Sequence, residues 1–368
     1  MRVLVVNAGS SSLKLRVLGH ADEVLFTEDL AAERGEFVPT ELERAVASIG
    51  PLCDAVGHRI VHGGTRFVGP TLLTPQVEDS LRKLTRLAPL HQATSLAALD
   101  VVRRALGALP EVACFDTAFH ASLPPEAATY AVPADWRDRL GVRRFGFHGL
   151  SHAYAGRRAA EVLDRPIEDL RIASCHLGSG ASVTAIRNGR SVDTTMGFTP
   201  LEGLVMATRS GSIDPGLVLW MLQQPGFEVD GVLHALESES GLRALAGTPD
   251  MAEVDERAQG GDPDARLALG VYAHRVKTAI AGMAASMGGI DTVTFTGGVG
   301  ENATTLRQLV ASDLGFLGVH IDDSLNDSAE PDMDISAGGS IPVLVLRARE
   351  DVQIAADVRR VLSEPSGE

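Results

Sequence analysis

The chain has 368 residues, 45% of them hydrophobic, which is enough for two packed domains because single cores rarely grow past roughly 250–300 residues. Its formal net charge of −15 argues against non-specific nucleic-acid binding, which needs a basic face. The three cysteines lack metal-ligand or CxxC spacing, and the N-terminal apolar run is too short to span a membrane. We therefore expect a cytoplasmic protein with reduced thiols, bound to neither nucleic acid nor membrane.

The chain begins with two strand patterns joined by small residues. Val3–Val6 is a run of apolar β-formers, Asn7–Ser12 reads Asn-Ala-Gly-Ser-Ser-Ser, and Leu13–Leu18 alternates apolar and polar side chains. The order predicts a strand, a tight turn and a second strand. A Walker-type phosphate loop would show a helix after the turn and a Gly-Lys-Ser/Thr ending, so the pattern argues against that class.

Three residues that can carry charge lie among small or apolar neighbours. Arg59, within Gly57–Gly64, is either in a surface ion pair or a buried guanidinium that needs an anion, and its neighbours favour the second. Asp116 follows an apolar strand pattern and fits equally well as the partner of a cation or as the cap of the next turn. A histidine in the setting of His148 is more often structural, although the adjacent glycines let a ligand approach closely.

A second hairpin pattern appears about half a chain after the first. Leu170–Cys175 and Ala181–Ile186 are strand-like and flank the turn His176–Gly180. Asn188-Gly189 then predicts a further tight hairpin turn. Two such hairpins favour an internal duplication, in which two related domains face each other and clamp a polyphosphate.

Two later segments are also rich in small residues. Asp193–Gly216 has almost no helical or strand periodicity and carries Arg209, and a long irregular segment in a compact domain is usually functional. Thr292–Thr296 predicts a strand, followed by a glycine turn at Gly297–Asn302 and a helix over Ala303–Leu314. That order commonly places backbone N–H groups against a nucleotide.

Helices and surface segments account for much of the remainder. The expected helices are Gln76–Ala88, Ala93–Leu106, His152–Leu163 and Asp264–Met287. Asp322–Gly339 predicts a surface loop or hairpin, and the tail Ser363–Glu368 is expected to fray.

Two arginines, one histidine and two hydroxyl-rich hairpins suit phosphoryl transfer, which depends mainly on positioning and charge stabilisation. No GxSxG, HExxH or paired Cys/His spacing supports a serine hydrolase or a zinc enzyme.

In their order along the chain, these motifs resemble those of the acetate kinases. Val6–Lys14 is similar to the first family signature and Asp193–Gly216 to the second, with GHRIVHGG, APLH, FDTAFH, RRFGFHGLSH and FTGGVGEN also in family order. The resemblance implies an α/β class with a duplicated ribonuclease-H-like (actin, Hsp70 and sugar kinase) two-domain fold and an active-site cleft between the domains. It implies an N-terminal domain of residues 1–119 plus the C-terminal helix 351–368. Residues 120–350 would form a C-terminal domain for nucleotide binding and dimerisation, in a homodimer.

The resemblance also implies residue roles. Asn7 and Glu350 would help hold Mg²⁺, with Mn²⁺ as an alternative ion. The expected catalytic residues are Arg59 and Arg209, which would hold the carboxylate and the transferred phosphoryl group, His148, which would stabilise the transition state, and Asp116, which would align the acceptor or Arg209. The acetate methyl pocket would comprise Val61, Leu90, Phe147 and Pro200, with Arg59 also binding substrate. The residues expected to bind ATP or ADP are Ser10, Ser12, Lys14, His176, Leu177, Gly178, Ser179, Gly180, Asp250, Met251, Ala252, Gly297, Gly298, Val299, Gly300 and Glu301.

The chain departs from the family pattern at several positions, most of them at the nucleotide end. Ser179 stands where the family usually has Asn, Ser212 where it has Asp, and Ala252 where it has Arg. Gln92 replaces the usual Asn of APLHN, and the turn before Glu350 lacks the usual Thr. These departures predict that, where the function of this chain differs from that of the family, the difference lies in its affinity for the phosphoryl donor or in which donor it uses.

Three functional hypotheses follow. The first is reversible Mg²⁺-dependent phosphoryl transfer from ATP to acetate. The second is the same reaction with propionate or another short-chain carboxylate, because one methylene in an apolar pocket is worth only about 1–3 kcal/mol. The third is a non-catalytic protein that binds nucleotide or acetyl phosphate on the same scaffold.

Overall fold

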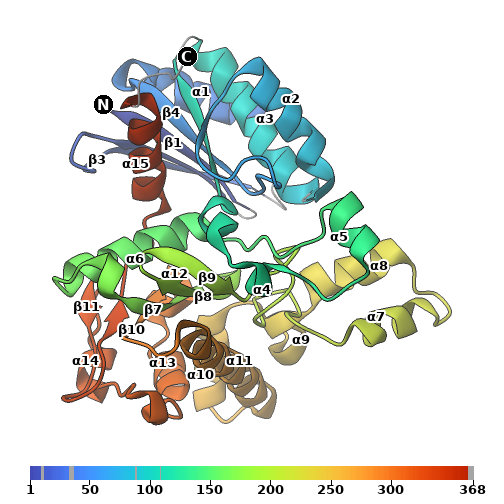
Figure 1. The fold of residues 1–368 in the computed structure, drawn as a ribbon, viewed down its shortest axis with the longest axis vertical. Coiled ribbons are helices and arrows are strands. Elements are labelled where there is room, and N and C mark those ends of the chain that lie inside the picture. Colours follow the sequence, from blue (N-terminus) through green and yellow to red (C-terminus); the bar gives the residue numbers. More distant parts are fainter. Residues whose placement is uncertain (10–11, 33–36, 88, 108, 364–368) are drawn as a thin grey trace. The chain divides into compact units, whose positions relative to one another are not determined.

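The computed structural model describes residues 1–9, 12–32, 37–87, 89–107 and 109–363. They form two compact units (Figure 1). Unit 1 comprises Met1–Ala121, His148–Tyr154 and Arg349–Glu368, and unit 2 comprises Ser122–Phe147 and Ala155–Ala348. The functional domain limits expected from the sequence stay a prediction. Within the described residues, no helix has both the length and the apolar character that crossing a membrane requires.

Each unit is built on one six-stranded sheet. The strands of unit 1 are β1 (Val3–Ala8), β2 (Ser12–Leu18), β3 (Val24–Ala31), β4 (Ala55–Ile60), β5 (Thr71–Leu72) and β6 (Glu111–Phe115). The strands of unit 2 are β7 (Arg171–Leu177), β8 (Ala181–Arg187), β9 (Arg190–Thr194), β10 (Thr292–Thr296), β11 (Met333–Asp334) and β12 (Val343–Val345).

The two sheets have the same topology. In unit 1 the order is β3-β2-β1-β4-β6-β5, with β1, β4 and β6 parallel and each of the other neighbouring pairs antiparallel. In unit 2 the order β9-β8-β7-β10-β12-β11 repeats this arrangement and these directions. The repetition confirms the duplicated α/β fold expected from the two hairpins, which are β1–β2 and β7–β8.

Helices cover both faces of the unit 1 sheet. They are α1 (Pro39–Ile49), α2 (Pro75–Lys83), α3 (Pro89–Leu106), the start of α6 (Gly149–Val162) and α15 (Glu350–Ser363). On one face β1 and β2 pack against α1 and α3, with a buried core that includes Leu4, Val6, Leu15, Leu42, Val46 and Val102. On the other face α15 packs against the sheet, with a buried core that includes Val5, Val112, Ile354 and Val358. Burying a side chain of this size contributes about 1.5–3 kcal/mol.

Gly57 on β4 allows α15 to lie close to the sheet. A Cβ atom at this position would lie 2.5 Å from Ile354 Cγ2 and 2.8 Å from Val358 Cγ2. Any larger residue would therefore push α15 away, and Glu350 at the start of α15 would move with it.

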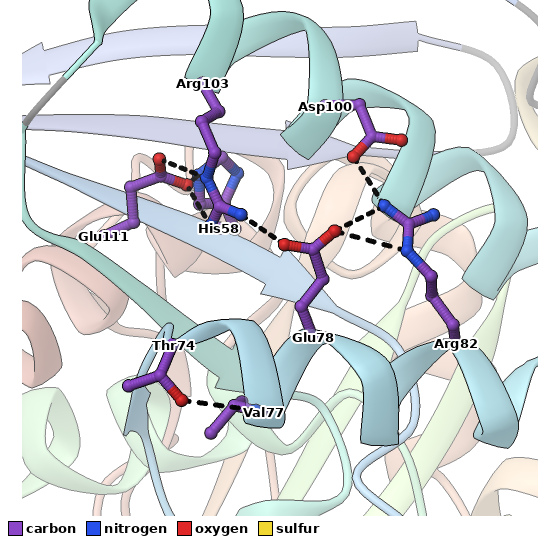
Figure 2. A network of polar contacts seen from close by, with 8 residues as sticks. All are labelled: His58, Thr74, Val77, Glu78, Arg82, Asp100, Arg103 and Glu111. Atoms are coloured by element: carbon purple, nitrogen blue, oxygen red, sulfur yellow. Dashed lines mark hydrogen bonds and ion pairs between the residues drawn. The ribbon is translucent and has the colours of Figure 1, made fainter.

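A chain of polar contacts joins α2 and α3 to the strands β4 and β6 (Figure 2). His58 Nε2 lies 3.0 Å from Glu111 Oε2, and Arg103 Nε donates to Glu111 Oε1 at 3.0 Å. Arg103 also pairs with Glu78, which accepts from Arg82 as well. Burial alone would raise the pKa of Glu111, but the hydrogen bonds from His58 and Arg103 outweigh it and lower that pKa. The carboxylate therefore stays ionised inside unit 1 and fixes its strands against α3.

The helices of unit 2 surround its sheet. They are α4 (Pro125–Ala128), α5 (Ala134–Leu140), the rest of α6, α7 (Pro215–Leu222), α8 (Val229–His234), α9 (Gly241–Ala246), α10 (Met251–Gln259), α11 (Pro263–Met287), α12 (Gly297–Asn302), α13 (Thr304–Ala311) and α14 (Asp323–Asp327). The long helix α11 packs on β7 and β8. Its start follows from Asp262, which accepts from two N–H groups of the first turn, and from Pro263 at the first helical position. Its end follows from Gly288, which is in the left-handed region.

Most expected elements are confirmed, with small shifts in their ends. The helices expected over Ala93–Leu106, His152–Leu163, Asp264–Met287 and Ala303–Leu314 correspond to α3, α6, α11 and α13. The helix expected over Gln76–Ala88 ends as α2 at Lys83 and continues as a 3₁₀ turn. Between Thr194 and Pro215 the chain has neither helix nor strand, as expected. The part of the predicted frayed tail beyond Ser363 lies outside the described residues.

One sequence prediction was wrong and another was incomplete. Gly297–Asn302 was expected to be a turn, but it is the helix α12, which begins at Gly297 with φ +82° directly after β10. Asp322–Gly339 was expected to be a surface loop or hairpin; its edge strand β11 pairs antiparallel with β12, as in a hairpin, but the segment also contains the short helix α14. The Asp322 carboxylate accepts from two N–H groups of α14 and so starts that helix.

Candidate functional site

Four of the expected catalytic and metal-binding residues meet in unit 1, three of them at the ends of neighbouring strands. Arg59 lies on β4, Asn7 on β1, and Asp116 directly after β6. Arg59 Nε and Nη2 donate to the two carboxylate oxygens of Asp116 at 2.9 and 2.6 Å. Arg59 Nη1 donates to Asn7 Oδ1 at 3.0 Å, and Asn7 Nδ2 donates to Glu350 Oε2 at 2.8 Å. These four residues, which we call the Arg59 cluster, come from parts of the chain up to 343 residues apart.

The buried carboxylates keep Arg59 charged. Burial alone would lower the pKa of Arg59, but Asp116 and Glu350 outweigh it and raise that pKa above its ordinary value. Burial raises the pKa of Asp116, and the Arg59 guanidinium opposes this. Asp116 gains its two charge-assisted hydrogen bonds only when it is ionised, so we assign the pair as guanidinium and carboxylate. The sequence predicted that Asp116 aligns the acceptor or Arg209, whereas the partner seen in unit 1 is Arg59.

Asn7 and Glu350 fit a magnesium ion by the chemistry of their donor atoms. Mg²⁺ prefers oxygen ligands and is usually held by one or two carboxylates, with water and substrate phosphates completing the shell. Asn7 and Glu350 are neighbours that carry an amide oxygen and a carboxylate, although the amide nitrogen of Asn7 faces Glu350 and its oxygen accepts from Arg59. In the described part of the chain, no three His, Cys, Asp or Glu side chains gather to form a self-sufficient metal site. Any ion held at Asn7 and Glu350 must therefore take further ligands from solvent or substrate.

His148 lies in strained backbone next to Asp116. Its φ is +56°, in the left-handed region that non-glycine residues seldom adopt. The next residue, Gly149, donates its N–H to the Asp116 carbonyl at 2.9 Å, and a Cβ on Gly149 would lie 2.2 Å from that oxygen. Only glycine allows this approach, so the contact with Asp116 fixes the turn that presents His148.

The phosphate hairpin of unit 1 is described in part. Ser10 lies outside the described residues, Ser12 begins β2, and Lys14 is exposed on that strand. Gly9 N–H donates to the Ser12 carbonyl at 2.9 Å, which closes the turn. Lys14 is therefore available to an anion in solution, and its role stays a prediction.

The expected methyl-pocket residues divide between the units. Val61 follows β4 in unit 1 and is buried, and Leu90 lies on α3 in the same unit. Phe147, almost fully buried, and the half-buried Pro200 lie in unit 2. Their assembly into one pocket stays a prediction.

Arg209 lies in the irregular segment of unit 2. Its Nη1 lies 4.0 Å from Met206 Sδ. Burial lowers the pKa of Arg209, and the charge of Glu237 opposes this. The backbone around it is irregular but closely packed, because Gly211 has φ +69° and a Cβ there would lie 2.4 Å from the Leu204 carbonyl oxygen.

Two of the expected nucleotide segments lie at the ends of neighbouring strands of unit 2. His176 and Leu177 end β7, and the turn Gly178–Gly180 is closed by Gly178 N–H donating to the Gly180 carbonyl at 2.9 Å. Gly297 begins α12 directly after β10, and a Cβ on Gly297 would lie 2.6 Å from the Leu177 carbonyl oxygen. The structure thus brings these two segments together, with the exposed residues Ser179 and Gly298 facing solvent.

Several other predicted nucleotide residues have structural contacts. Asp250 accepts from Ala252 N–H at 2.9 Å and caps α10, while Met251 is buried. Glu301 Oε1 accepts from the N–H groups of Gly297 and Ala348, at 3.1 and 2.9 Å. Their roles in nucleotide binding stay predictions.

Two departures from the family pattern have clear contacts. Gln92 is fully buried, and its amide exchanges two hydrogen bonds of 3.2 Å with the backbone of His62. Ser212 Oγ accepts from Gly203 N–H at 3.0 Å. Both side chains therefore order irregular backbone next to predicted site residues.

Sequence reasoning missed one set of interacting side chains in unit 2. Tyr130, Arg144 and Glu202 interact with one another and with the backbone of residues 194–198. Arg144 lies within the RRFGFHG motif, which could have drawn attention to it, whereas no local pattern marks Tyr130.

Comparison with known proteins gives a consistent result across the chain. A family model described as "Acetokinase family" matches residues 36–356. The chain is 41% identical to an acetate kinase from Synechococcus sp. over 402 residues, covering 98% of this chain and 99% of that protein. It is 43% identical to one from Deinococcus radiodurans, covering 97% of each chain.

Solved structures agree with the sequence comparison. A Porphyromonas gingivalis acetate kinase superposes with a TM-score of 0.89 at 34% identity, covering 98% of this chain and 100% of that one. A Francisella tularensis propionate kinase also gives a TM-score of 0.89, at 32% identity, covering 97% and 98% of the two chains.

Proposed function

Because the chain belongs to the acetokinase family, we propose that it transfers a phosphoryl group reversibly between ATP and acetate, giving acetyl phosphate and ADP. The observation that carries the proposal is the Arg59 cluster, in which a partly buried guanidinium lies beside an amide and two carboxylates. Such a cluster suits an anionic acceptor next to a metal-bound phosphate.

The chemistry needs little acid–base catalysis. An acetate carboxylate is already ionised at pH 7, so one of its oxygens attacks the γ-phosphorus directly. The bond from that phosphorus to the bridging oxygen breaks, and the electron pair leaves with ADP. The main obstacle is the repulsion between two anions, which positive side chains reduce.

Each residue of the cluster has a separate task in this proposal. Arg59 binds the acceptor carboxylate, and Asp116 keeps the guanidinium plane in one orientation. Asn7 and Glu350 would hold Mg²⁺, which would supply positive charge to the phosphate oxygens. His148 and Arg209 stabilise the charge that develops on the transferred phosphoryl group.

An assay that traps acetyl phosphate with hydroxylamine tests the proposal. The full-length protein with acetate, ATP and Mg²⁺ should form acetyl phosphate, trapped as the hydroxamate, well above the level of an Arg209→Ala variant. Equal signals from the two proteins would contradict kinase activity. Nucleotide binding by calorimetry without turnover would instead support the non-catalytic alternative.

Propionate is the second candidate acceptor, favoured by the similarity to the Francisella tularensis propionate kinase. The two acids differ by one methylene, worth about 1–3 kcal/mol in an apolar pocket. We expect kcat/KM to be highest for acetate among acetate, propionate and butyrate, and a maximum at propionate would select the alternative. Including GTP and pyrophosphate as donors tests the effect of Ser179 and Ala252.

We also propose that the chain forms a homodimer through α7 and α8 of unit 2. These helices and the segment between them expose large apolar side chains: Leu217 (45%), Leu219 (63%), Trp220 (55%), Phe227 (45%), Val229 (65%) and Leu233 (46%). A patch of this kind supports a protein interface. Sedimentation equilibrium should show a dimer that Trp220→Asp dissociates, whereas Phe316→Asp, at an exposed position outside these helices, should not. A wild-type monomer would overturn this proposal.

The proposed location is the cytoplasm. All three cysteines, Cys53, Cys114 and Cys175, are free and buried, as expected for a reducing compartment.

A further inference from the structure

Arg144 makes several of the hydrogen bonds that tie the loop of residues 195–203 in unit 2 to the rest of the unit. Arg144 Nη1 donates to the carbonyl oxygens of Thr194, Thr195 and Met196, at 3.2, 3.1 and 2.9 Å. Arg144 Nη2 donates to Glu202 Oε1 at 2.6 Å. Since this loop has no ladder or helix of its own, side-chain donors must satisfy its carbonyl groups.

Tyr130 completes the same arrangement from the other side of Glu202. Its hydroxyl donates to Glu202 Oε2 and accepts from Phe198 N–H, the latter at 2.9 Å. The Arg144 guanidinium also lies 5.5 Å from the centre of the Tyr130 ring. We call Tyr130, Arg144 and Glu202 the brace. Each member contacts the other two, and the brace contacts the loop at both ends.

Gly197 brings the loop backbone directly against the brace. A Cβ atom there would lie 1.7 Å from Glu202 Oε2 and 2.2 Å from the Tyr130 hydroxyl. The Gly197 carbonyl in turn accepts from the N–H groups of Phe145 and Gly146, at 3.1 and 3.2 Å. A displacement of the brace therefore shifts both the loop and the segment that leads to Phe147.

The loop and this segment carry two residues of the proposed methyl pocket. Pro200 lies within the loop, and Phe147 follows Gly146 directly. At its far end, Gly203 exchanges hydrogen bonds with Ser212, next to the stretch that carries Arg209. The brace is thus bonded to backbone that precedes or contains Phe147 and Pro200, without being a contact to the acceptor itself.

We propose that Tyr130, Arg144 and Glu202 are positioning residues that set which acyl chain length the acceptor site takes. By holding the segments of Phe147 and Pro200 in one arrangement, they keep the pocket short enough to favour acetate. The inference rests on the proposed function. If the brace only stabilised the fold, loosening it would lower the activity toward all acceptors and donors alike.

The test is Tyr130→Phe, which removes one hydroxyl and leaves the ring. Tyr272→Phe is a matched control, because Tyr272 is fully buried on α11 and its hydroxyl has no hydrogen-bond partner among the described residues. We expect Tyr130→Phe to raise KM for acetate about tenfold and to lower the acetate-to-propionate ratio of kcat/KM by a factor of about 3–10. KM for ATP should stay within about twofold of wild type, and Tyr272→Phe should match wild type in all three values.

Arg144→Lys provides a second variant, should Tyr130→Phe be poorly folded. An ammonium group cannot reach three carbonyls and a carboxylate in the fork geometry of a guanidinium, so acceptor selectivity should fall here too. Folded variants that keep the wild-type acceptor ratio, or that change KM for ATP as much as KM for acetate, overturn the inference. If wild type makes no acyl phosphate at all, the proposed function fails together with the inference. If the wild-type protein is active and the variants keep its acceptor ratio and KM values, the inference fails and the proposed function stands.

Discussion

The sheets of units 1 and 2 share strand order and direction, yet their corresponding strands carry different polar groups. In unit 1, β1, β4 and β6 lead to Asn7, Arg59 and Asp116, which are bonded to one another. In unit 2, the corresponding strands β7 and β10 end at Leu177 and Thr296, and the helix α12 begins at a glycine directly after β10. The duplicated topology determines which strand ends lie side by side. The residues at those ends determine whether that edge of the sheet carries charged side chains or backbone N–H groups.

The interiors of the two sheets differ in the same way. The strands of unit 1 bury His58 and Glu111, which form an ion-pair network. The strands of unit 2 bury hydroxyl groups, among them Ser174, Thr184 and Thr294. If charge distinguishes unit 1, then substitutions that neutralise its charged residues should alter its acceptor binding or its stability and leave the fold of unit 2 intact.

The largest expected effect is on Arg59. Arg59→Gln should lower kcat/KM for acetate by about 10²–10³, because it removes the fork that binds the acceptor and leaves Asp116 buried without its cation. The double variant with Asp116→Asn should regain thermal stability without regaining activity. Arg2→Gln, which breaks an exposed ion pair with Asp54 in the same unit, is the control and should keep wild-type kinetics. A loss of less than tenfold in Arg59→Gln would show that the charged edge is not what binds the acceptor.

Glu111→Gln tests the charge inside the unit 1 sheet. It should destabilise the protein by about 3 kcal/mol, since it removes the carboxylate that neutralises Arg103 and the hydrogen bond from His58. Urea unfolding measures this change. Glu161→Gln on α6 breaks an exposed pair with Arg158 and should cost less than about 0.5 kcal/mol. Equal shifts in the two variants would mean that the network in Figure 2 adds no more stability than a surface pair.

His62, just after β4, makes the stability of unit 1 depend on pH. Burial lowers the pKa of His62 to about 4, and its Nδ1 accepts from Gly64 N–H at 2.8 Å, which requires the unprotonated atom. The folded state therefore binds this proton less readily than the unfolded state. Stability should be fully present above pH 6.5 and should fall by on the order of 2–3 kcal/mol as the pH drops from 6.5 to 4. His62→Gln should flatten the profile over that window, and His274→Gln, at an exposed position on α11, should leave it unaltered. A profile for His62→Gln as steep as that of wild type would exclude His62 as the cause.

Gly297→Ala tests the backbone edge of unit 2. With φ +82° and the Leu177 carbonyl 2.6 Å from the added Cβ, the variant should lose about 1–2 kcal/mol. It should raise KM for ATP while KM for acetate stays the same. Gly282→Ala lies on α11 with no atom within 4 Å of its Cβ, so it should be neutral or stabilising by about 0.5–1 kcal/mol. A rise in KM for acetate instead would contradict the hypothesis that the charged strand ends of unit 1 bind the acceptor and the glycine-rich strand ends of unit 2 bind the nucleotide.

Local sequence patterns predicted most helices and strands, because the residues that form such an element lie close together in the chain. Strand alternation and small turn residues identified β1–β2 and β7–β8, since both act within a few residues of one another. The same reasoning failed for Gly297–Asn302, where a glycine-rich turn and a glycine-rich helix start look alike in sequence. It also missed α14, although Asp322 is a normal helix-capping residue.

The candidate site depends on contacts that no local pattern contains. The sequence predicted both Arg59 and Asp116 as site residues but not their contact, which joins residues 57 positions apart through the pairing of β4 with β6. Tyr130 and Glu202 are 72 positions apart, and their proximity depends on how an irregular loop packs. The carboxylate of Asp250 caps α10, a local contact that the resemblance did not indicate, and its role in nucleotide binding stays a prediction.

The helix α15 has a consequence for how the protein is made. Ile354, Ala355 and Val358 close one face of the unit 1 sheet, yet they follow the whole of unit 2 along the chain. During synthesis the first strands leave that apolar face uncovered while more than two hundred residues of unit 2 are translated. Unit 1 therefore completes its core only after unit 2 has been translated, and a chain truncated before Ile354 exposes this face to aggregation or proteolysis.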